Sequence, residues 1–220
     1  MQNNTHAGAS AYNPITLKLY DWWVLKVSNR YAWRCPTDTV LLPHFKQHIG
    51  NKHLDIGVGT GYYLPHLPAH VELSLLDLNA SSLQAASAKA GDKVKDCLKH
   101  DVFQPLPLGW NDRFDSISLF YLLHCLPGSL NDKAQAIENI ARALKKEGTL
   151  FGATILGDGV THNAFGNKLM KVYNKKGIFA NRSDSEAQLR DMLLTRFARV
   201  EVKTVGVVAL FSASEPRAIG

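Results

Sequence analysis

Residues 53–61 read HLDIGVGTG, a short apolar run that leads into three glycines at alternate positions. Glycine lets a backbone turn tightly and approach a ligand closely, and the N–H groups at the start of a following helix can receive a polar or anionic group. A dinucleotide fingerprint, G-x-G-x-x-G, would need glycine at position 62, where this chain has Tyr62. The spacing therefore argues against a pyrophosphate ligand, and a tight strand-to-helix connection without a ligand is the alternative.

Strand and helix patterns alternate on both sides of this turn. The strand-like apolar runs lie at 53–56, 71–78, about 94–99, 115–121 and after Gly148. Helices are expected directly after the glycine turn, over 80–90, and from a cap at Ser129 or Asn131 to about 145. Near-continuous apolar strands that alternate with helices are typical of a parallel sheet covered on both faces, so the sequence predicts an α/β fold.

The C-terminal part departs from this alternation. Helical patterns over about 161–176 and 185–195 are followed by two β-rich runs, 199–205 and 207–212, which only Gly206 separates. A parallel crossover needs a dozen or more residues, so these runs are expected to be antiparallel neighbours or one bent strand. The last strand is therefore predicted to enter a mostly parallel sheet in the opposite direction.

Two acidic residues mark the ends of the second and third predicted strands. Asp77 lies 20 residues beyond Gly57, where the carboxyl edge of the sheet would direct its carboxylate toward a ribose diol. Asp101 ends the next strand and suits an adenine amino group, which donates hydrogen bonds that a carboxylate accepts. Each residue alone could be a helix cap or a loop residue. The glycine turn, Asp77 and Asp101 follow the first, second and third predicted strands in order, and together they favour a binding site.

Together these segments resemble the class I S-adenosylmethionine-dependent methyltransferases. HLDIGVGTGYYLP resembles the first motif of that family, LLDLN its acidic ribose motif, HDVFQPLP its adenine motif and RFDSISLFYLLHCLP its fourth-strand motif. IENIARALKKEGTLFGATIL is similar to the helix and fifth strand that follow, so the resemblance covers about residues 50–156. It implies a Rossmann-like, seven-stranded, mostly parallel sheet with an antiparallel last strand, helices on both faces, and S-adenosyl-L-methionine as the cofactor.

The resemblance also implies cofactor-binding residues near the ends of the first four strands: Asp55, Gly57, Gly59, Gly61, Asp77, Leu78, Asp101, Val102, Leu119 and Phe120. By this resemblance the glycines lie under the methionine portion, Asp77 binds the ribose hydroxyls, and Asp101 lies at the adenine. Asp55 would hold either the glycine turn or the cofactor ammonium, which the backbone near Leu119 and Phe120 would also face.

Two segments are expected to build a lid over this core. Residues 1–49 form a predicted N-terminal helical lid segment, and residues 50–220 form the methyltransferase core with a lid insertion at about 157–197. Both segments should lie above the carboxyl edge of the sheet, and aromatic residues there favour a small, aromatic or apolar acceptor. Core packing of an N-terminal helix is the alternative explanation for some of these aromatic residues.

The N-terminal segment carries a second, more distant resemblance. The stretch from Leu19 to Arg34 resembles the N-terminal region of quinone-ring C-methyltransferases. This resemblance implies that Tyr20 or Arg34 reaches the cofactor carboxylate.

His124 is the first candidate for a catalytic residue. Methyl transfer from a sulfonium is an in-line displacement, so an enzyme chiefly has to place the nucleophile in a dry pocket, and a base is needed only for a protonated nucleophile. His124 follows the fourth predicted strand, and an imidazole pKa of about 6.5 suits proton transfer at neutral pH. The alternative is a structural histidine that shapes the pocket. Tyr20 and Tyr121 are weaker candidates for the base.

Charge and composition limit the partners. The 220 residues include 25 Lys and Arg against 19 Asp and Glu, a net charge of +6 without a concentrated run. Nucleic-acid-binding proteins usually concentrate basic residues on one face, so a nucleic-acid partner is not expected. The expected partner is a small-molecule methyl acceptor. A basic groove around 168–182 would support the alternative of an RNA or protein methyltransferase. A non-catalytic adenosylmethionine-binding protein is a further alternative.

Cysteine and histidine usage predicts neither disulfides nor a metal site. The three cysteines are widely spaced with no C-x-x-C pair, and the nine histidines occur singly, as at His44, His53 and His70. Such histidines are expected to face solvent or to cap elements. No apolar stretch is long enough to span a membrane and no signal-peptide core is present, so the expected location is cytoplasmic.

Overall fold

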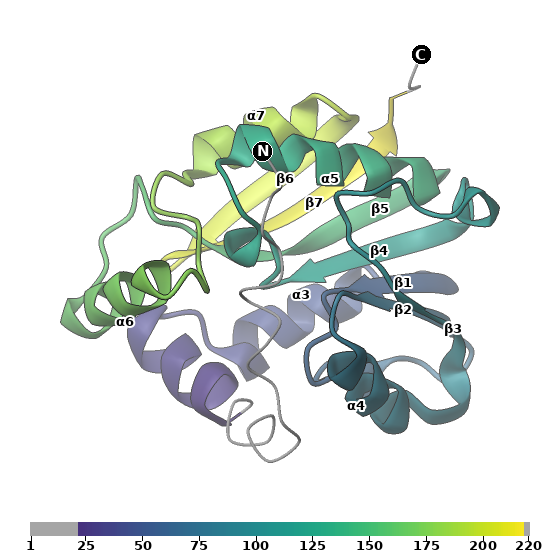
Figure 1. The fold of residues 1–220 in the computed structure, drawn as a ribbon, viewed down its shortest axis with the longest axis horizontal. Coiled ribbons are helices and arrows are strands. Elements are labelled where there is room, and N and C mark those ends of the chain that lie inside the picture. Colours follow the sequence, from purple (N-terminus) through teal and green to yellow (C-terminus); the bar gives the residue numbers. More distant parts are fainter. Residues whose placement is uncertain (1–21, 218–220) are drawn as a thin grey trace.

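The computed structural model describes residues 22–217, with side chains from residue 27 onward. Within this range seven strands form one sheet in the order β3-β2-β1-β4-β5-β7-β6 (Figure 1). The strands are β1 (Lys52–Ile56), β2 (Glu72–Asp77), β3 (Val94–Lys99), β4 (Phe114–Phe120), β5 (Leu144–Ile155), β6 (Phe197–Val205) and β7 (Val208–Pro216). The first five pair in parallel, while β7 runs antiparallel to both β5 and β6, which confirms the predicted sheet.

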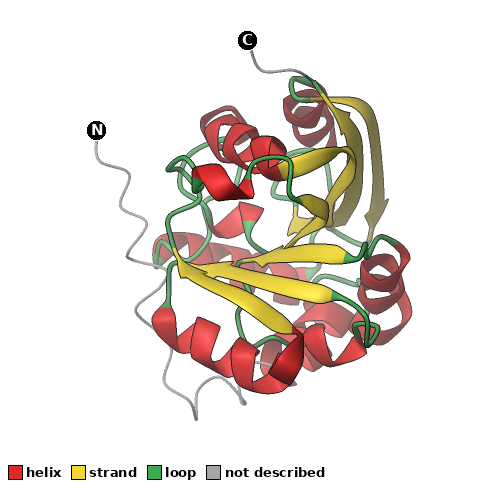
Figure 2. Ribbon diagram, turned by 90° about the vertical axis from the view of Figure 1, so that its right-hand side faces the viewer, coloured by secondary structure: helices red, strands yellow, loops and turns green. Residues whose placement is uncertain are grey.

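Helices cover both faces of this sheet, as predicted (Figures 1 and 2). They are α3 (Leu42–Gln47), α4 (Ala80–Ala90), α5 (Leu130–Ala143), α6 (Ala164–Lys175) and α7 (Glu186–Leu194). The π-helical and 3-10-helical segments are η1 (Trp22–Ala32), η2 (Thr37–Leu41), η3 (Leu64–His66), η4 (Gly91–Lys93), η5 (Leu108–Trp110) and η6 (Leu123–Cys125). None of the helices in residues 22–217 has the length and apolar character that a membrane crossing needs.

Two apolar cores result, one on each face of the sheet. On the first face Ile137 of α5 and Leu193 of α7 pack into the core that contains Ile117 of β4. On the second face Phe45 of α3 and Leu83 of α4 pack into the core that contains Val58 of the glycine turn. The parallel strands are therefore buried on both sides, which explains their near-continuous apolar sequences.

Local sequence signals set the ends of the helices. Asn79 accepts a hydrogen bond from the N–H of Ser81 and caps α4. Ser129, one of the two predicted caps, begins α5 in a capping box with Asp132. The Asn79 cap starts α4 directly after β2, at the carboxyl edge of the sheet where the candidate site lies, and the Ser129 cap starts α5 after the η6 turn that follows β4.

The helix expected directly after the glycine turn is absent from the described chain, and that prediction is wrong. A single short turn, η3, spans Leu64–His66 instead. Pro65 lies within it and Pro68 follows it, and proline has no N–H to continue a helical hydrogen-bond ladder. The glycine turn therefore leads into an irregular connection.

Candidate active site

Glycines of the turn after β1 serve two different purposes. Gly59 has a φ of +52°, and nothing lies within 4 Å of where its Cβ would be. Gly61 has a φ of +69°, but a Cβ there would lie 2.8 Å from the Cα of Ala86 on α4. Gly61 therefore lets the turn pack against α4, whereas Gly59 keeps an open face where a ligand can approach the backbone.

Asp77 ties the end of β2 to this turn. Its carboxylate accepts hydrogen bonds from the N–H of Asn79 at 2.8 Å and from the N–H of Gly59 at 3.4 Å. Burial raises the pKa of Asp77, while these backbone donors act in the opposite direction. Leu78 follows and is half-buried. The predicted ribose-binding carboxylate is thus held next to the open glycine.

Asp101 and Val102 are fixed at the end of β3. The Asp101 carboxylate accepts a hydrogen bond from the N–H of Phe103 at 3.0 Å, which orders the turn. Val102 is buried, and its carbonyl accepts a bond from the side-chain amide of Asn139 on α5 at 3.0 Å. Asn139 carried no signal in the sequence, because only the fold brings α5 against this loop.

Asp55 is buried at the end of β1, between the glycine turn and the second core. Burial raises its pKa to about 6, the hydroxyl of Ser118 lowers it, and the charge of Asp77 raises it further. Ser118 donates a hydrogen bond to its carboxylate. With a pKa of about 6, the Asp55 carboxyl is mostly ionised at pH 7 and takes up a proton under mildly acidic conditions.

Four polar side-chain atoms of η1, of the chain after the glycine turn and of the end of β4 are buried and have no hydrogen-bond partner among the described residues: Ser28 Oγ, Asn29 Oδ1, Tyr63 OH and Tyr121 OH. The phenols of Tyr63 and Tyr121 affect each other and the Cys35 thiol electrostatically, and burial raises the pKa of both phenols. The backbone carbonyl of Asn29 accepts a hydrogen bond from the N–H of Cys35 at 2.8 Å. Leaving such groups unpaired costs free energy, so they are available to a polar ligand.

Tyr121, at a φ of +59°, follows Leu119 and Phe120 at the end of β4. Leu119 and Phe120 are both buried. Non-glycine residues rarely adopt this backbone conformation, which directs the phenol away from the path of an extended strand. Sequence reasoning found Tyr121 only as a weak base candidate and gave no role to Ser28, Asn29 or Tyr63, although Tyr63 lies within the first-motif stretch HLDIGVGTGYYLP.

His124 is 3% exposed and held by two contacts with β5. Its Nδ1 atom accepts a hydrogen bond from the backbone N–H of Ile155 at 3.3 Å and lies 3.3 Å from the hydroxyl of Thr154. The ring of Phe179 packs against the imidazole with 4.5 Å between ring centroids. Burial lowers the pKa of His124 to about 3. Because a backbone N–H can only donate, Nδ1 is the acceptor and the ring proton lies on Nε2.

The two remaining N-terminal candidates have different outcomes. Tyr20 lies outside the described residues. The exposed Arg34 donates a hydrogen bond to the carbonyl of Thr161, so its described contact is with the insertion.

The N-terminal segment and the insertion pack against each other (Figure 1). Asn163, which caps α6, donates a hydrogen bond to the carbonyl of Tyr31 at 2.7 Å. The ring of Trp33 meets His162 edge to face and lies 6.2 Å from Phe179 between ring centroids. Phe179 in turn touches His124, so the two segments meet beside the candidate catalytic side chain.

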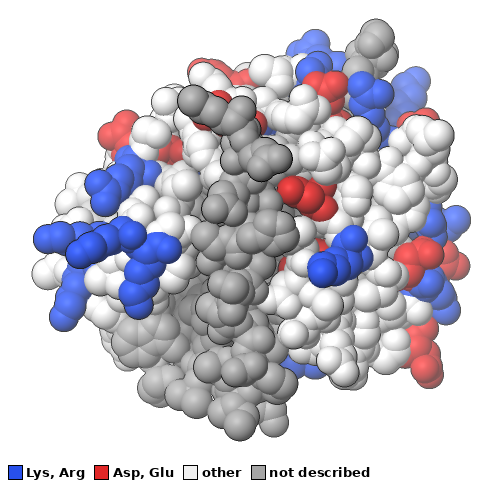
Figure 3. All heavy atoms as spheres, in the orientation of Figure 1, with Lys and Arg blue, Asp and Glu red and all other residues white. Residues whose placement is uncertain are grey.

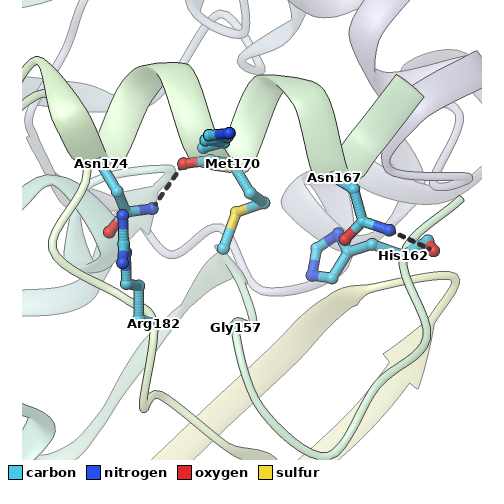
Figure 4. Close-up of a pocket in the computed structure, with 7 residues that line it drawn as sticks. Gly157, His162, Asn167, Met170, Asn174 and Arg182 are labelled. Atoms are coloured by element: carbon cyan, nitrogen blue, oxygen red, sulfur yellow. Dashed lines mark hydrogen bonds between the residues drawn. The ribbon is translucent and has the colours of Figure 1, made fainter. Parts of the chain in front are cut away.

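A pocket of about 400 Å³ lies between α6 and the loop that follows β5, lined by Gly157, His162, Asn167, Met170, Lys171, Asn174 and Arg182 (Figure 4). Most of these side chains are polar or basic. Figure 3 shows basic side chains gathered over α6. Lys171 and Arg182 have no carboxylate partner among residues 22–217, whereas Arg113 and several other cations there do.

Known proteins resemble this chain in sequence and in fold. A family model for a methyltransferase domain matches residues 54–150. The chain is 58% identical over 189 residues to the uncharacterized protein YbcY of Escherichia coli, covering 86% of this chain and 97% of YbcY. It is 43% identical over 215 residues to the physcion biosynthesis cluster O-methyltransferase of Aspergillus chevalieri, covering 97% of each. A solved DhpI–SAH complex has the same fold, with a TM-score of 0.66, 18% identity and 98% of both chains covered.

Proposed function

The chain belongs to the class I S-adenosylmethionine-dependent methyltransferases, and we propose that it methylates a small aromatic or apolar metabolite of secondary metabolism. The observation that carries this proposal is the open face of Gly59 next to the Asp77 carboxylate, together with the buried, unpaired phenols of Tyr63 and Tyr121. The A. chevalieri relative, named for a biosynthesis cluster, supports the class of acceptor.

These residues fit S-adenosylmethionine, which supplies a methyl group on a sulfonium sulfur. Asp77 would accept hydrogen bonds from the ribose hydroxyls, and the loop at Asp101 and Val102 would hold the adenine. The methionine end carries an ammonium and a carboxylate. Asp55 suits the ammonium, and the unpaired phenols of Tyr63 and Tyr121 are donors that suit the carboxylate.

The lid segments, at residues 1–49 and about 157–197, would enclose the acceptor. The aromatic contacts that link Trp33, Phe179 and His124 support an apolar wall. The basic pocket along α6 supports a polar or anionic substituent at the far end of the acceptor. Enclosure excludes water and brings the acceptor nucleophile in line with the methyl carbon, which accelerates a displacement without covalent chemistry by the protein.

His124 is assigned here to positioning the acceptor. With Nδ1 accepting from the N–H of Ile155, Nε2 carries a proton and can donate a hydrogen bond to an acceptor oxygen. A general base would have to take up a proton at Nδ1, because Nε2 already carries one. That proton would point at the backbone N–H of Ile155, and this repulsion disfavours a role of His124 as general base. An acceptor that is already ionised, or whose proton leaves to solvent, needs no such base.

Asp77→Ala tests the cofactor site. Hydrogen bonds to a charged group are worth about 1.5–3 kcal/mol, so the affinity for S-adenosylhomocysteine should fall about 10- to 150-fold in calorimetric titration. Asp96→Ala, a half-buried carboxylate on the neighbouring strand β3, is the matched control. Unchanged affinity in Asp77→Ala would remove Asp77 from the site, and tighter binding of NAD would refute the cofactor assignment.

A screen of small acceptors with labelled adenosylmethionine, scored by product mass and structure, tests the substrate class. Aromatic and apolar acceptors should become labelled. Labelling of RNA or protein alone would refute it and favour the alternative suggested by the basic side chains on α6.

We also assign the enzyme to the cytoplasm. Cys35, Cys97 and Cys125 are free thiols in the structure, which supports a reducing compartment. Cell fractionation with an antibody against the native chain checks this location.

A further inference from the structure

A row of polar side chains runs through the centre of the sheet toward Asp55. Ser116 and Ser118 of β4 and His53 of β1 are each 0% exposed, and the ring of Phe45 on α3 meets His53 edge to face. His53 Nδ1 lies 2.8 Å from Ser116 Oγ, and His53 Nε2 lies 3.1 Å from Ser118 Oγ. The expectation that His53 faces solvent or caps an element is therefore wrong, because the pairing of β1 with β4 places it in the core.

The two ends of this row fix the direction of its hydrogen bonds. The backbone N–H of Gly50 can only donate, so Ser116 Oγ accepts its hydrogen bond at 2.8 Å. At the other end Ser118 donates to the Asp55 carboxylate, which leaves its oxygen to accept from the Nε2–H of His53. His53 Nδ1 then accepts from the hydroxyl of Ser116.

Each group in the row therefore donates its hydrogen bond to the next group in the direction of Asp55, and Ser118 donates to Asp55 itself. Burial lowers the pKa of His53 to about 3, which keeps the imidazole neutral so that it transmits a hydrogen bond and not a charge. Aligned hydrogen bonds in a low-dielectric interior polarise one another. Buried polar side chains are costly unless they are fully paired, and this row is paired from Gly50 to Asp55.

We propose that His53, Ser116 and Ser118 are positioning residues that keep the Asp55 carboxylate ionised and oriented toward the ammonium group of the cofactor. The proposal rests on the proposed function, which puts the ammonium at Asp55. The other groups that act electrostatically on Asp55 are Asp77, whose charge opposes ionisation, and the uncharged phenol of Tyr63. The bond from Ser118 opposes the effect of burial and of Asp77.

Ser118→Ala in the full chain removes the last donor of the row. The ionisation of Asp55 is followed by NMR of ¹³C-labelled aspartate carboxyls, with its signal assigned by its loss in Asp55→Asn. The midpoint, about 6 in the wild type, should rise by about 1–2 pH units. At pH 7 the affinity for S-adenosylhomocysteine should then fall about 2- to 10-fold and recover at pH 9. If the substitution weakened binding only through a structural defect, the loss of affinity would persist at pH 9.

Two further variants make this test independent of folding defects. Ser118→Cys is nearly isosteric with a weaker donor and should shift the midpoint in the same direction. Ser74→Ala removes a buried hydroxyl from β2, outside the row, and should leave the midpoint unchanged.

An Asp55 midpoint that is unchanged in both Ser118 variants would overturn the proposal, whatever happens to ligand binding. A shifted midpoint with unchanged affinity at every pH would overturn the assignment of Asp55 to the ammonium. Methyl transfer itself would stand in both cases, since it is measured separately by the acceptor screen.

Discussion

Replacing His124 separates two roles that predict very different losses of activity. The hydrogen bond from Ile155 to Nδ1 leaves only an Nε2 donor toward the acceptor. Losing one neutral hydrogen bond costs about 0.5–1.5 kcal/mol, so His124→Ala should lower kcat/KM about 2- to 13-fold, mainly through KM. Loss of a general base would instead lower kcat about 100-fold or more. His124→Gln retains an amide donor and should fall between Ala and the wild type.

The assay is the pH dependence of kcat and KM between about pH 5 and 9, once an acceptor is in hand. Burial lowers the pKa of His124 to about 3, so the imidazole is neutral over this range and no limb of the profile should belong to it. The exposed His70→Ala is the control for loss of a histidine, and thermal denaturation of His124→Ala checks that the contact with Phe179 is not needed for folding. An acidic limb that disappears in His124→Ala, together with a 100-fold loss of kcat, would refute the positioning role.

Further predictions concern the turn, the loop beyond α6 and the lid. Gly59→Ala should weaken S-adenosylhomocysteine binding, measured by calorimetry, and cost about 1–2 kcal/mol in the free energy of unfolding. Gly61→Ala should lower the free energy of unfolding further, because its Cβ meets α4, and denaturation measures this difference. Lys133→Met leaves the buried partner Asp184 unpaired and should cost about 3–5 kcal/mol in urea denaturation, and a double variant with Asp184→Leu should regain most of it. S-Adenosylhomocysteine should slow amide exchange in residues 12–34, and slow exchange without ligand would instead indicate core packing.

Strand ends could be predicted from the sequence because their arrangement follows from the order of elements. Once β1 and β2 are parallel neighbours, Asp77 must lie beside the glycine turn, and the structure places its carboxylate 3.4 Å from the Gly59 nitrogen. The helix expected after the turn does not form, because Pro65 and Pro68 interrupt the segment. Local chemistry at those two positions decides against a helix even though the surrounding pattern favours one.

The unpaired side chains Tyr63 and Tyr121, which we propose for the methionine end of the cofactor, could not be assigned from the sequence, because their role depends on contacts between distant segments. Tyr63, Tyr121 and Cys35 come from three separate parts of the chain and interact only in the folded protein. Tyr63 and Tyr121 lie in segments that resemble family motifs, but the resemblance assigned neither of them to cofactor binding. Their signal is structural: a buried hydroxyl without a partner is rare in native proteins and points to a missing ligand.

His53 shows the same limit and why it matters for function. In the sequence it is one isolated histidine between Lys52 and Leu54, with nothing nearby to pair with in a core. Its partners are serines 63 and 65 residues away on β4, brought within hydrogen-bond distance by strand register alone. A buried histidine with both ring nitrogens paired is a stable core residue, and the same pairing directs its Nε2–H at Ser118, which in turn donates to the Asp55 carboxylate. Burial and polarity at His53 are therefore explained together by the row that ends at Asp55.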